Sequence, residues 1–521
     1  MRTFALLAGL LLFAGCLDSS GPKAEQGTTS QTAPPYVGAE GADGTPAGGG
    51  GGRGGGSTGG GGNGAGAIAI PPGCDIDRPA IIHSPGGIEI VTTRPRGLPC
   101  LVPTIYGTGE PSIGVTSAGN LFLYPAYLAP AEQLQGAEQF TGIGIARSLD
   151  QGKTFTRQIS GLGGQETANF HPYTADPFMY VDPYTDRVFM EDLAVPPFNC
   201  SNLSFSDDEG ESWTQTMGGC LVWDHVGYGS GPSTLDDLDG YPVVIQRCAI
   251  TMMATTLASQ ATGCQKTLDG GMTWQPPGDP AFFGGPDGLP YAPATCNGAA
   301  HHVFVDHRGW TWIGRDWCGT GPWVALSKDE GATWTQVHVQ DKPMSYHDVA
   351  VGADSAGNAY AFWIDHDRRP VLSVSKDDGA TWSEPWDIAP PGLTAAGMSN
   401  IAPAGAGKAG FTYAGTFEGM EGVYAIVAAG YALDSDHPIF HTAVPAEPVN
   451  PGDCNGGTCD GETDFLDTSI GPDGSVWGSY ATPNVAAGRL WGAPSLWDAA
   501  DPNGVFGGWA DGATSTAAAA T

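Results

Sequence analysis

The stretch Ser375-Lys-Asp377-Asp-Gly379-Ala-Thr381-Trp382 decides the fold of this 521-residue chain, because its pattern recurs along the sequence. The same pattern, S/T-x-D-x-G-x-T/S-W/F, begins at Ser148, Ser206, Thr267 and Ser327. Its aspartates follow one another at intervals of 48 to 61 residues and are Asp150, Asp208, Asp269, Asp329 and Asp377. A near-constant period of this length indicates one structural unit for each copy of the motif.

Each residue type in the motif suits a closed turn between two strands. The Asp and Ser/Thr side chains bond nearby backbone groups, and the Gly takes the turn conformation. The aromatic residue then packs between neighbouring sheets. We therefore expect the five aspartates to be structural and assign no catalysis to them.

A second repeat lies between these motifs and reads as a strand, a tight turn and another strand. It has period-2 patterning around Gly-centred turns, which is typical of β-hairpins. The candidate hairpins are residues 111–125, 177–191, 235–247, 302–315, 348–365, 400–414 and 465–480. Each would supply the two inner strands of a sheet, and the following motif, where present, would join the two outer strands.

The five motifs resemble the Asp box of sialidase-like β-propellers. The resemblance implies an all-β propeller of four-stranded antiparallel blades, with each box on the face away from the active site. Seven hairpins favour seven blades, and six blades, as in sialidases proper, are the alternative. A TIM barrel is excluded because the required amphipathic helices are missing.

The composition divides the chain into five parts. Residues 1–15 are predicted to be a lipoprotein signal peptide. Residues 16–72 are predicted to be a lipidated Cys followed by a flexible Gly/Ser-rich tether. Residues 73–103 are an N-terminal extension, in which residues 79–92 are expected to close the ring by joining the final blade. The propeller is assigned to residues 104–500 and a flexible tail to residues 501–521.

Export is predicted by Met1-Arg2 followed by the short apolar run Phe4 to Ala14. This run ends in Leu-Phe-Ala-Gly-Cys16, which resembles a lipobox and implies that Cys16 is lipidated. The other ten cysteines are spaced as five local disulfides, which suits an oxidising compartment. The expected pairs are Cys74 with Cys100, Cys200 with Cys220, Cys248 with Cys264, Cys296 with Cys318, and Cys454 with Cys459.

The net charge of −34, from 55 acidic and 21 basic residues, excludes phosphate backbones as partners. We therefore expect no nucleic acid. A membrane contact is expected only through the lipid anchor, and the protein is expected to be a monomer.

Ligands of propellers bind at the face where the first strands begin and the second strands end. The hairpin alignment places ionisable side chains there, and the expected ligand contacts are Arg247, Arg315, His302, His347, Asp365 and Asp464. If Arg247 and Arg315 face the channel, they favour an anionic ligand such as a uronic acid, a sialic acid or a sulfated sugar. If neighbouring carboxylates neutralise them, they hold the blades together instead.

The resemblance to sialidases also implies a Tyr nucleophile, a Glu that activates it, an Asp acid/base and three arginines that bind a carboxylate. The candidates for catalysis are Asp176, Glu191, Tyr413 and Tyr480. However, the Arg-Ile-Pro motif that carries the first arginine in that family is absent from this chain. The resemblance to sialidases therefore predicts the fold of this chain, but it does not predict the catalytic residues.

The acidic residues among the candidates could form a Ca²⁺ site, because Ca²⁺ prefers hard oxygen ligands. Its candidate ligands are Asp176, Asp192 and Asp467, and no cofactor is required by the expected function. The leading hypothesis is a surface-displayed propeller that binds glycans or other extracellular polymers. The alternative is an exo-acting glycosidase or a polysaccharide lyase that uses the same pocket.

Overall fold

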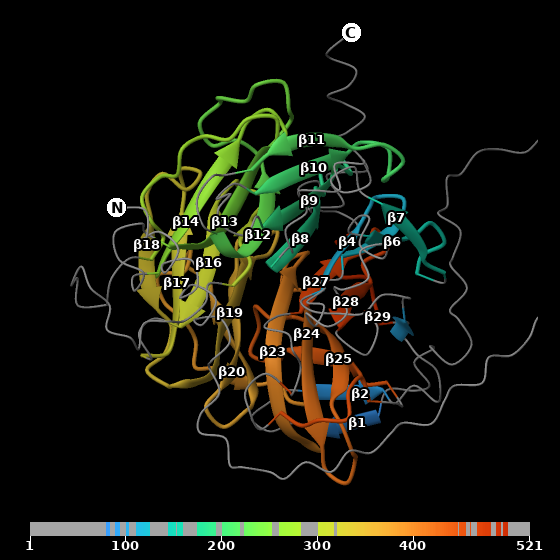
Figure 1. The fold of residues 1–521 in the computed structure, drawn as a ribbon. Helices are drawn as coiled ribbons and strands as arrows, with labels where there is room; N and C mark the ends of the chain where they lie inside the picture. Colours follow the sequence, from blue (N-terminus) through green and yellow to red (C-terminus); the bar gives the residue numbers. More distant parts are fainter. Residues whose placement is uncertain are drawn as a thin grey trace, which may run out of the picture. The chain divides into compact units, whose positions relative to one another are not determined.

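The fold is seen in a computed structural model, and the described residues all belong to the compact unit Ile70–Thr521. They are residues 80–83, 89–93, 101–103, 111–124, 144–152, 154–159, 175–193, 201–218, 223–252, 260–282, 301–316, 320–445, 448–454, 459, 466–480, 486–490 and 493–498. Their regular elements are all β-strands (Figure 1). No helix among them has the length and hydropathy that crossing a bilayer demands. The expected leader, tether, Cys16 and C-terminal tail lie outside the described residues.

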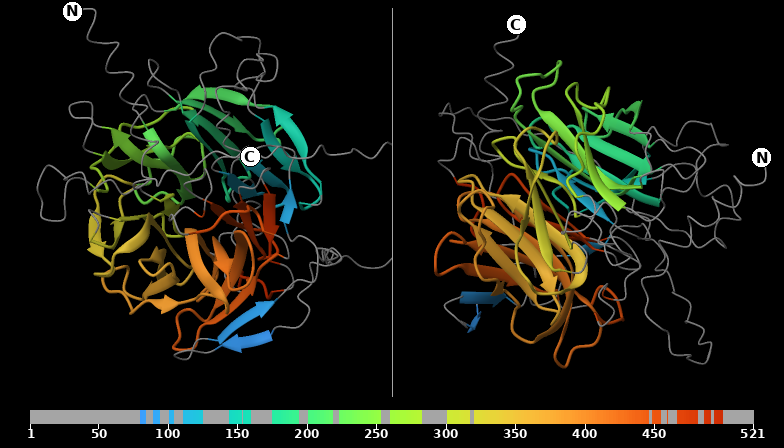
Figure 2. Two further views of the ribbon diagram at one scale, coloured as in Figure 1. Left: turned by 60° about the horizontal axis from the view of Figure 1, so that its bottom comes forward. Right: turned by 90° about the vertical axis from the view of Figure 1, so that its left-hand side faces the viewer.

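Seven sheets follow one another in chain order around a ring and form a seven-bladed β-propeller (Figure 2). Blade 1 contains β4 (Ser112–Val115), β5 (Leu121–Tyr124), β6 (Gly144–Ser148) and β7 (Thr156–Ile159). Blade 2 contains β8 (Ala175–Val181), β9 (Val188–Leu193), β10 (Asn202–Ser206) and β11 (Thr214–Met217). Blade 3 has three described strands, β12 (Trp223–Gly231), β13 (Val244–Met252) and β14 (Gln260–Thr267). The predicted fold class and the favoured blade number are confirmed.

The second half of the ring is built in the same way. Blade 4 contains β15 (Phe304–Val305), β16 (Thr311–Asp316), β17 (Pro322–Ser327) and β18 (Thr335–His338). Blade 5 contains β19 (Met344–Ala353), β20 (Ala359–Asp365), β21 (Pro370–Ser375) and β22 (Trp386–Asp387). Blade 6 contains β23 (Leu393–Pro403), β24 (Ala409–Phe417), β25 (Tyr424–Tyr431) and β26 (Ile439–Ala443). Blade 7 contains β27 (Asp467–Ile470), β28 (Val476–Tyr480) and β29 (Ala486–Arg489).

The N-terminal extension adds strands to two of the blades. Strand β3 (Leu101–Pro103) pairs with β29 as the outermost strand of blade 7, so it closes the ring. Strands β1 (Ala80–His83) and β2 (Glu89–Thr93) extend blade 6 instead, where β2 runs parallel to β26. The prediction that residues 79–92 join the final blade is therefore wrong. Those residues alternate like a strand and find an edge, but the three-residue β3 is too short to show a pattern.

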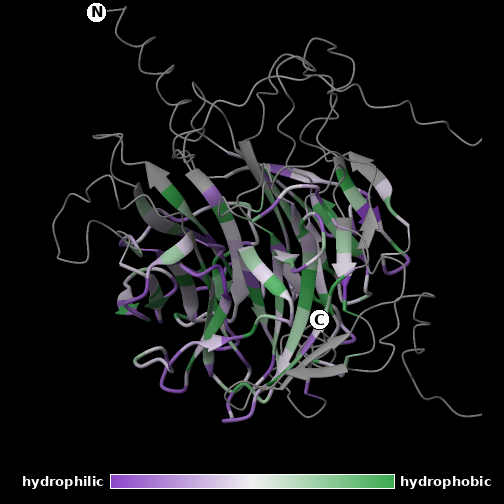
Figure 3. Cartoon of the chain, turned by 90° about the horizontal axis from the view of Figure 1, so that it is seen from below, coloured by the Kyte–Doolittle hydropathy of each residue, from purple (hydrophilic) through white to green (hydrophobic). Residues whose placement is uncertain are grey.

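Hydrophobic residues are concentrated in the strands and hydrophilic residues in the turns (Figure 3), and buried apolar side chains form clusters that join neighbouring blades. Phe122 of blade 1 packs with Val188 of blade 2, and Phe189 of blade 2 packs with Tyr228 of blade 3. Trp312 of blade 4 belongs to one cluster with Trp363 of blade 5 and is fully buried. Because both faces of a blade are covered by its neighbours, the middle strands read as nearly continuous apolar runs.

Antiparallel pairing gives the ring two structurally different faces. The innermost strands begin at one of them, which we call the strand-start face. They end at the other, the turn face, which holds the turns between first and second strands and those between third and fourth strands. The five sequence motifs follow third strands and so lie on the turn face.

All five motifs form the same turn. In Ser148–Phe155, Asp150 Oδ1 accepts from the backbone N–H of Thr154 at 2.9 Å, and Ser148 Oγ accepts from the N–H of Gly152 at 2.8 Å. Equivalent bonds recur around Asp208, Asp269, Asp329 and Asp377. The motif glycines have φ between 78° and 97°, and a Cβ on Gly152 would lie 2.6 Å from the Trp477 ring of blade 7. Only Gly suits this combination of backbone angle and close packing.

In several of these turns the residue before the motif glycine also links two blades. Asn120 Nδ2, in the turn of blade 1, donates to Glu209 Oε2 of blade 2 at 2.7 Å. The N–H of Thr234, from blade 3, donates to Glu330 Oε1 of blade 4 at 2.6 Å. Arg308, from blade 4, bonds Asp378 Oδ1 of blade 5 at 2.8 Å. The turn face is therefore tied together from blade to blade.

Three buried aspartates, which the sequence patterns did not single out, organise the turns after β8, β15 and β19. Asp354 Oδ1 accepts from the N–H groups of Ala356 and Asn358, each at 2.9 Å, and its Oδ2 accepts from the N–H of Gly407 in the next blade at 2.7 Å. Asp182 and Asp306 make comparable networks at their own turns. An Asp directly after a strand, at the start of a turn, is the sequence signal that would have identified them.

One predicted hairpin is displaced. Residues 235–247 were expected to form the inner hairpin of blade 3, but its innermost strand is β12 and the Leu235–Gly240 stretch lies in the connection. The sequence of β12, with three glycines, lacks the alternation that marks a strand. Arg247 consequently lies within β13 instead of at its end.

Candidate functional site

The innermost strands surround a cavity of about 160 Å³ on the ring axis. Its lining combines aromatic, polar and small side chains from β4, β8, β12, β15, β19, β23 and β27 and from the residues beside them. The lining residues with polar or aromatic side chains that bear on function are Phe178, Tyr180, Tyr228, His301, His302, Asn400 and Asp467.

Three polar residues from three blades meet at one side of this cavity. Asn400 Nδ2 lies 3.3 Å from Asp467 Oδ1 and 3.5 Å from His302 Nδ1, and it donates to the carbonyl of Leu466 at 2.9 Å. His302 Nδ1 lies 3.8 Å from Asp467 Oδ1. These groups offer hydrogen-bond donors and acceptors within a partly apolar hollow, as ligand sites in proteins do.

The position of His302 depends on the small residues of β12. A Cβ on Gly227 would lie 2.7 Å from the Cα of His302, so only glycine permits this approach. His301 and His302 precede β15, and this irregular backbone allows both side chains to line the cavity, with ring centroids 5.0 Å apart. His301 Nε2 lies 2.9 Å from the carbonyl oxygen of Ser399.

Aromatic side chains form another part of the lining. The rings of Phe178 and Tyr228 are stacked, with centroids 6.0 Å apart and an interplanar angle of 9°. The rings of His302 and Phe178 form a T-shaped pair with centroids 4.5 Å apart. Tyr180 bonds Ser230 through its hydroxyl at 2.7 Å. Aromatic rings and hydrogen-bonding groups that line one cavity are suited to a ligand with both an apolar face and hydroxyl groups.

Behind Tyr228 lies a fully buried ion pair. Arg247 Nε donates to Glu191 Oε2 at 2.6 Å, its NH2 also bonds Glu191 Oε1, and the Tyr228 hydroxyl donates to Glu191 Oε2. Ser201 Oγ accepts from Arg247 NH2 at 2.9 Å. Burial by itself would lower the pKa of Arg247, but Glu191 and Tyr228 raise it, so the guanidinium stays charged. Burial and the Glu191 charge raise the pKa of Tyr228 well above its usual value, which disfavours the phenolate.

The two arginines expected to contact a ligand are absent from the lining. Arg247 is committed to Glu191, and Arg315 is 1% exposed between blades 3 and 4, where its NH1 lies 3.2 Å from Thr262 Oγ1. Burial lowers the pKa of Arg315 to about 10. The hypothesis that both arginines face the channel and bind an anionic ligand therefore does not describe this structure.

The two candidate tyrosine nucleophiles also lie away from the cavity lining. Tyr413 and Tyr480 are buried in the core of blades 6 and 7, and the Tyr480 hydroxyl donates to the carbonyl of Ile426 at 2.8 Å. Burial raises the pKa of both phenols. A tyrosine next to a glutamate does occur, but it is Tyr228, in a strand that no pattern revealed.

The remaining candidates are dispersed or lie outside the described part. Asp365 is half-buried at the end of β20, accepts from the N–H of Arg369 at 2.9 Å, and has a pKa raised by burial. Asp176, Asp192 and His347 lie in β8, β9 and β19, but their side chains are outside the described set, as is the whole of Asp464. Among described residues, no three His, Cys, Asp or Glu side chains are grouped as metal ligands.

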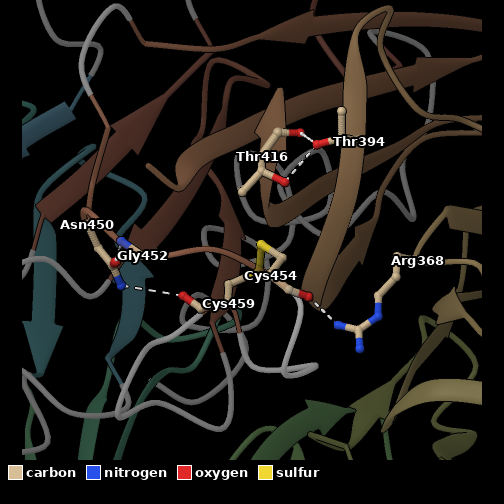
Figure 4. Close-up of a disulfide and its surroundings, with 7 residues drawn as sticks. All are labelled: Arg368, Thr394, Thr416, Asn450, Gly452, Cys454 and Cys459. Carbon is tan, nitrogen blue, oxygen red and sulfur yellow. Dashed lines mark hydrogen bonds between the residues drawn. A yellow bond between two sulfur atoms is a disulfide. The ribbon is translucent and has the colours of Figure 1, made fainter. Parts of the chain in front are cut away.

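Two of the five expected disulfides lie among the described residues, and both form. Cys248–Cys264 joins directly opposed residues of β13 and β14, and Cys454–Cys459 closes a loop between blades 6 and 7. Arg368 donates to the carbonyl of Cys454, which holds this loop against blade 5 (Figure 4). Disulfides suit an extracellular or otherwise oxidising compartment.

The other three expected disulfides fall on parts of the chain that the structure does not describe. They are the pairs Cys74 with Cys100, Cys200 with Cys220, and Cys296 with Cys318, and all six residues lie outside the described ranges. These three pairings therefore stay predictions from sequence spacing.

No family model and no curated protein matches the chain. Among solved structures, a Hadza microbial sialidase is 16% identical, with a TM-score of 0.38, over 64% of this chain and 65% of its own. An α-L-arabinanase from Penicillium chrysogenum is 16% identical, with a TM-score of 0.38, over 67% and 96%. A lectin from Aleuria aurantia is 9% identical, with a TM-score of 0.38, over 62% and 93%. Likenesses at these values assign no activity to this chain.

Proposed function

We propose that this protein is an exported, lipid-anchored propeller of the sialidase-like Asp-box kind that binds the terminal sugar of an extracellular glycan in its axial cavity. The observation that carries the proposal is the meeting of His302, Asn400 and Asp467 in a cavity that the stacked rings of Phe178 and Tyr228 also line. Hydroxyl groups would bond the polar side, while the apolar face of a sugar ring would lie on the aromatic side.

The size of the cavity supports a single sugar unit. At about 160 Å³ it is smaller than the sites of drug-sized ligands, which occupy roughly 300–1,000 Å³. A polymer would therefore present one end to the axis, and the rest of the glycan would remain outside.

The number of carboxylates among the described lining residues favours binding over hydrolysis. Glycosidases use two carboxyl groups on either side of the bond that is cleaved. Among the described lining residues Asp467 supplies the single carboxylate. Glycoside cleavage is the alternative, and the observation in its favour is the Tyr228–Glu191 pair at the cavity wall, which resembles the Tyr–Glu pair of sialidases.

A glycan array probed with the purified full chain tests the proposal. His302→Gln and Asn400→Ala are expected to weaken binding to any positive glycan at least ten-fold. Gln215→Ala, on the exposed outer strand of blade 2, serves as the matched control and is expected to bind normally. Binding that survives both cavity variants would refute the site, and release of free sugar that Tyr228→Phe abolishes would establish the enzymatic alternative.

A further inference from the structure

The cavity and its surroundings contain an unusual shortage of positive charge. No Lys or Arg is among the described residues that line it, whereas Asp467 places a carboxylate there. A lysine or arginine for this site would have to come from another part of the ring.

The chain from residue 104 onward has fifteen lysines and arginines, and the turn face takes most of them. Seven are ion-paired with carboxylates there: Arg147, Arg187, Lys266, Arg308, Lys328, Lys408 and Arg489. Lys376 belongs to the fifth motif turn, on the same face. These cations neutralise the acidic turns at the end of the propeller where the innermost strands finish.

Few basic residues belong to the strand-start face. Arg247 and Arg315 are buried between blades, Arg369 bonds Asp387 at 3.0 Å, and Arg368 is held on the Cys454 loop. Lys342 is exposed between β18 and β19.

The last two basic residues of this region belong to blade 1. Arg157 lies in β7, the outermost strand of that blade, and so is remote in the sheet from the innermost strands at the axis. Lys153 is the one basic residue from position 104 onward that lies outside the described ranges.

We infer that the cavity selects uncharged sugars and rejects anionic ones, an inference that rests on the proposed function. A uronic or sialic acid would bring its carboxylate beside Asp467 without a described Lys or Arg in the lining to compensate its charge. Like charges repel strongly when they are partly removed from water, and an unpaired buried carboxylate is costly. Neutral hydroxyl groups, in contrast, can accept from the Asn400 amide and donate to Asp467.

Matched pairs of methyl glycosides test this selectivity with the full chain. The methyl hexosides of glucose, galactose and mannose are compared with the corresponding methyl hexuronides, which differ only in carrying a carboxylate at the sixth carbon. Titration calorimetry at neutral pH is expected to show, for the hexoside that binds, an affinity at least ten-fold higher than that of its uronide. Asp467→Asn is expected to narrow this difference, because the repelling charge is removed.

The outcomes separate the inference from the proposed function. A uronide that binds as tightly as its hexoside, or more tightly, overturns the inference and leaves glycan binding in place. An undiminished difference in a folded Asp467→Asn variant also overturns it. If no hexoside, uronide or array glycan binds, the proposed function fails and the inference fails with it. Asp436→Asn, on the turn face, is the charge-matched control, and should Asp467→Asn not fold, the wild-type pairs still decide.

Discussion

The backbone N–H of Ile113 in blade 1 donates a hydrogen bond to Asp467 Oδ2 in blade 7 at 3.0 Å, across 354 residues of sequence. The same carboxylate accepts from the N–H of Thr468 at 2.8 Å and approaches Asn400 in blade 6. One side chain thus joins the last blade to the first while it shapes the cavity.

Replacement of Asp467 by Ala is expected to lower the free energy of unfolding by about 1–3 kcal/mol, because a partly buried backbone donor at the ring closure loses its acceptor. Urea unfolding of the purified chain measures the change. Asp436→Ala, at an exposed carboxylate, provides the comparison and should change stability by less than about 0.5 kcal/mol. An equal effect of the two substitutions would show that the closing bond contributes nothing.

Removal of one member of the buried pair is expected to destabilise the protein strongly. Arg247→Met leaves the Glu191 carboxylate buried without its cation and should cost about 3–5 kcal/mol. The double variant Glu191→Leu/Arg247→Met leaves no uncompensated charge and should lose less than the sum of the two single variants. Double-mutant analysis of urea unfolding measures this coupling, and strict additivity would contradict a direct pair.

The motif aspartates are expected to act on stability and not on ligand binding. Asp269→Ala removes the acceptor for the N–H and hydroxyl of Thr273, at 2.9 and 2.6 Å, and should lower the free energy of unfolding by about 1–3 kcal/mol. Because the turn lies on the face away from the starts of the innermost strands, glycan binding by the folded variant should equal that of the wild type. A stable variant that had lost binding would refute the structural assignment.

Acid is expected to weaken the motif turns. Hydrogen bonds from the Ser212 hydroxyl and N–H lower the pKa of Asp208, and those from Thr381 lower the pKa of Asp377. A folded-state pKa below the unfolded value of about 3.9 means that the stabilisation is complete above that pH and is lost as the pH falls through the folded pKa.

The pH profile of urea unfolding between pH 5 and pH 2 tests this expectation. Asp208→Asn/Asp377→Asn should have a smaller loss of stability below about pH 4 than the wild type, because neither amide titrates. The difference is expected to be modest, since solvent screens exposed carboxylates such as these. Parallel profiles for the two proteins would show that these turns do not contribute to acid sensitivity.

Lipidation and the complete disulfide set are predictions that mass spectrometry can check. Peptide mapping of the membrane fraction without reduction should yield a diacyl- or triacyl-modified Cys16 together with Cys248–Cys264 and Cys454–Cys459. The same map should contain three further linked peptides, which join Cys74 to Cys100, Cys200 to Cys220 and Cys296 to Cys318. Cys16→Ser should release the protein from membranes. An unmodified Cys16, or a free thiol among the other ten cysteines, would contradict the prediction.

Short-range patterns were sufficient to predict the propeller. The motif around Asp377 and its four relatives each close a turn through bonds that span four residues, so their geometry is local and their period reports the blade. The continuous apolar run of strands such as Ala359–Asp365, which is buried along almost its whole length, is likewise a pattern within one segment. These features predicted the fold class, favoured seven blades over six, and led us to expect a structural role for the motif aspartates.

The cavity and its chemistry were decided only by the tertiary structure. Tyr228 lies in a glycine-rich strand without alternation, and Glu191 meets Arg247 across blades 2 and 3. The choice between a ligand-binding and a structural arginine depends on whether a carboxylate lies within hydrogen-bonding distance, and sequence spacing does not contain that distance. Local hydrogen bonds repeat and can be read from the chain, whereas contacts among His302, Asn400 and Asp467 exist only because the ring brings residues separated by 165 positions around one axis.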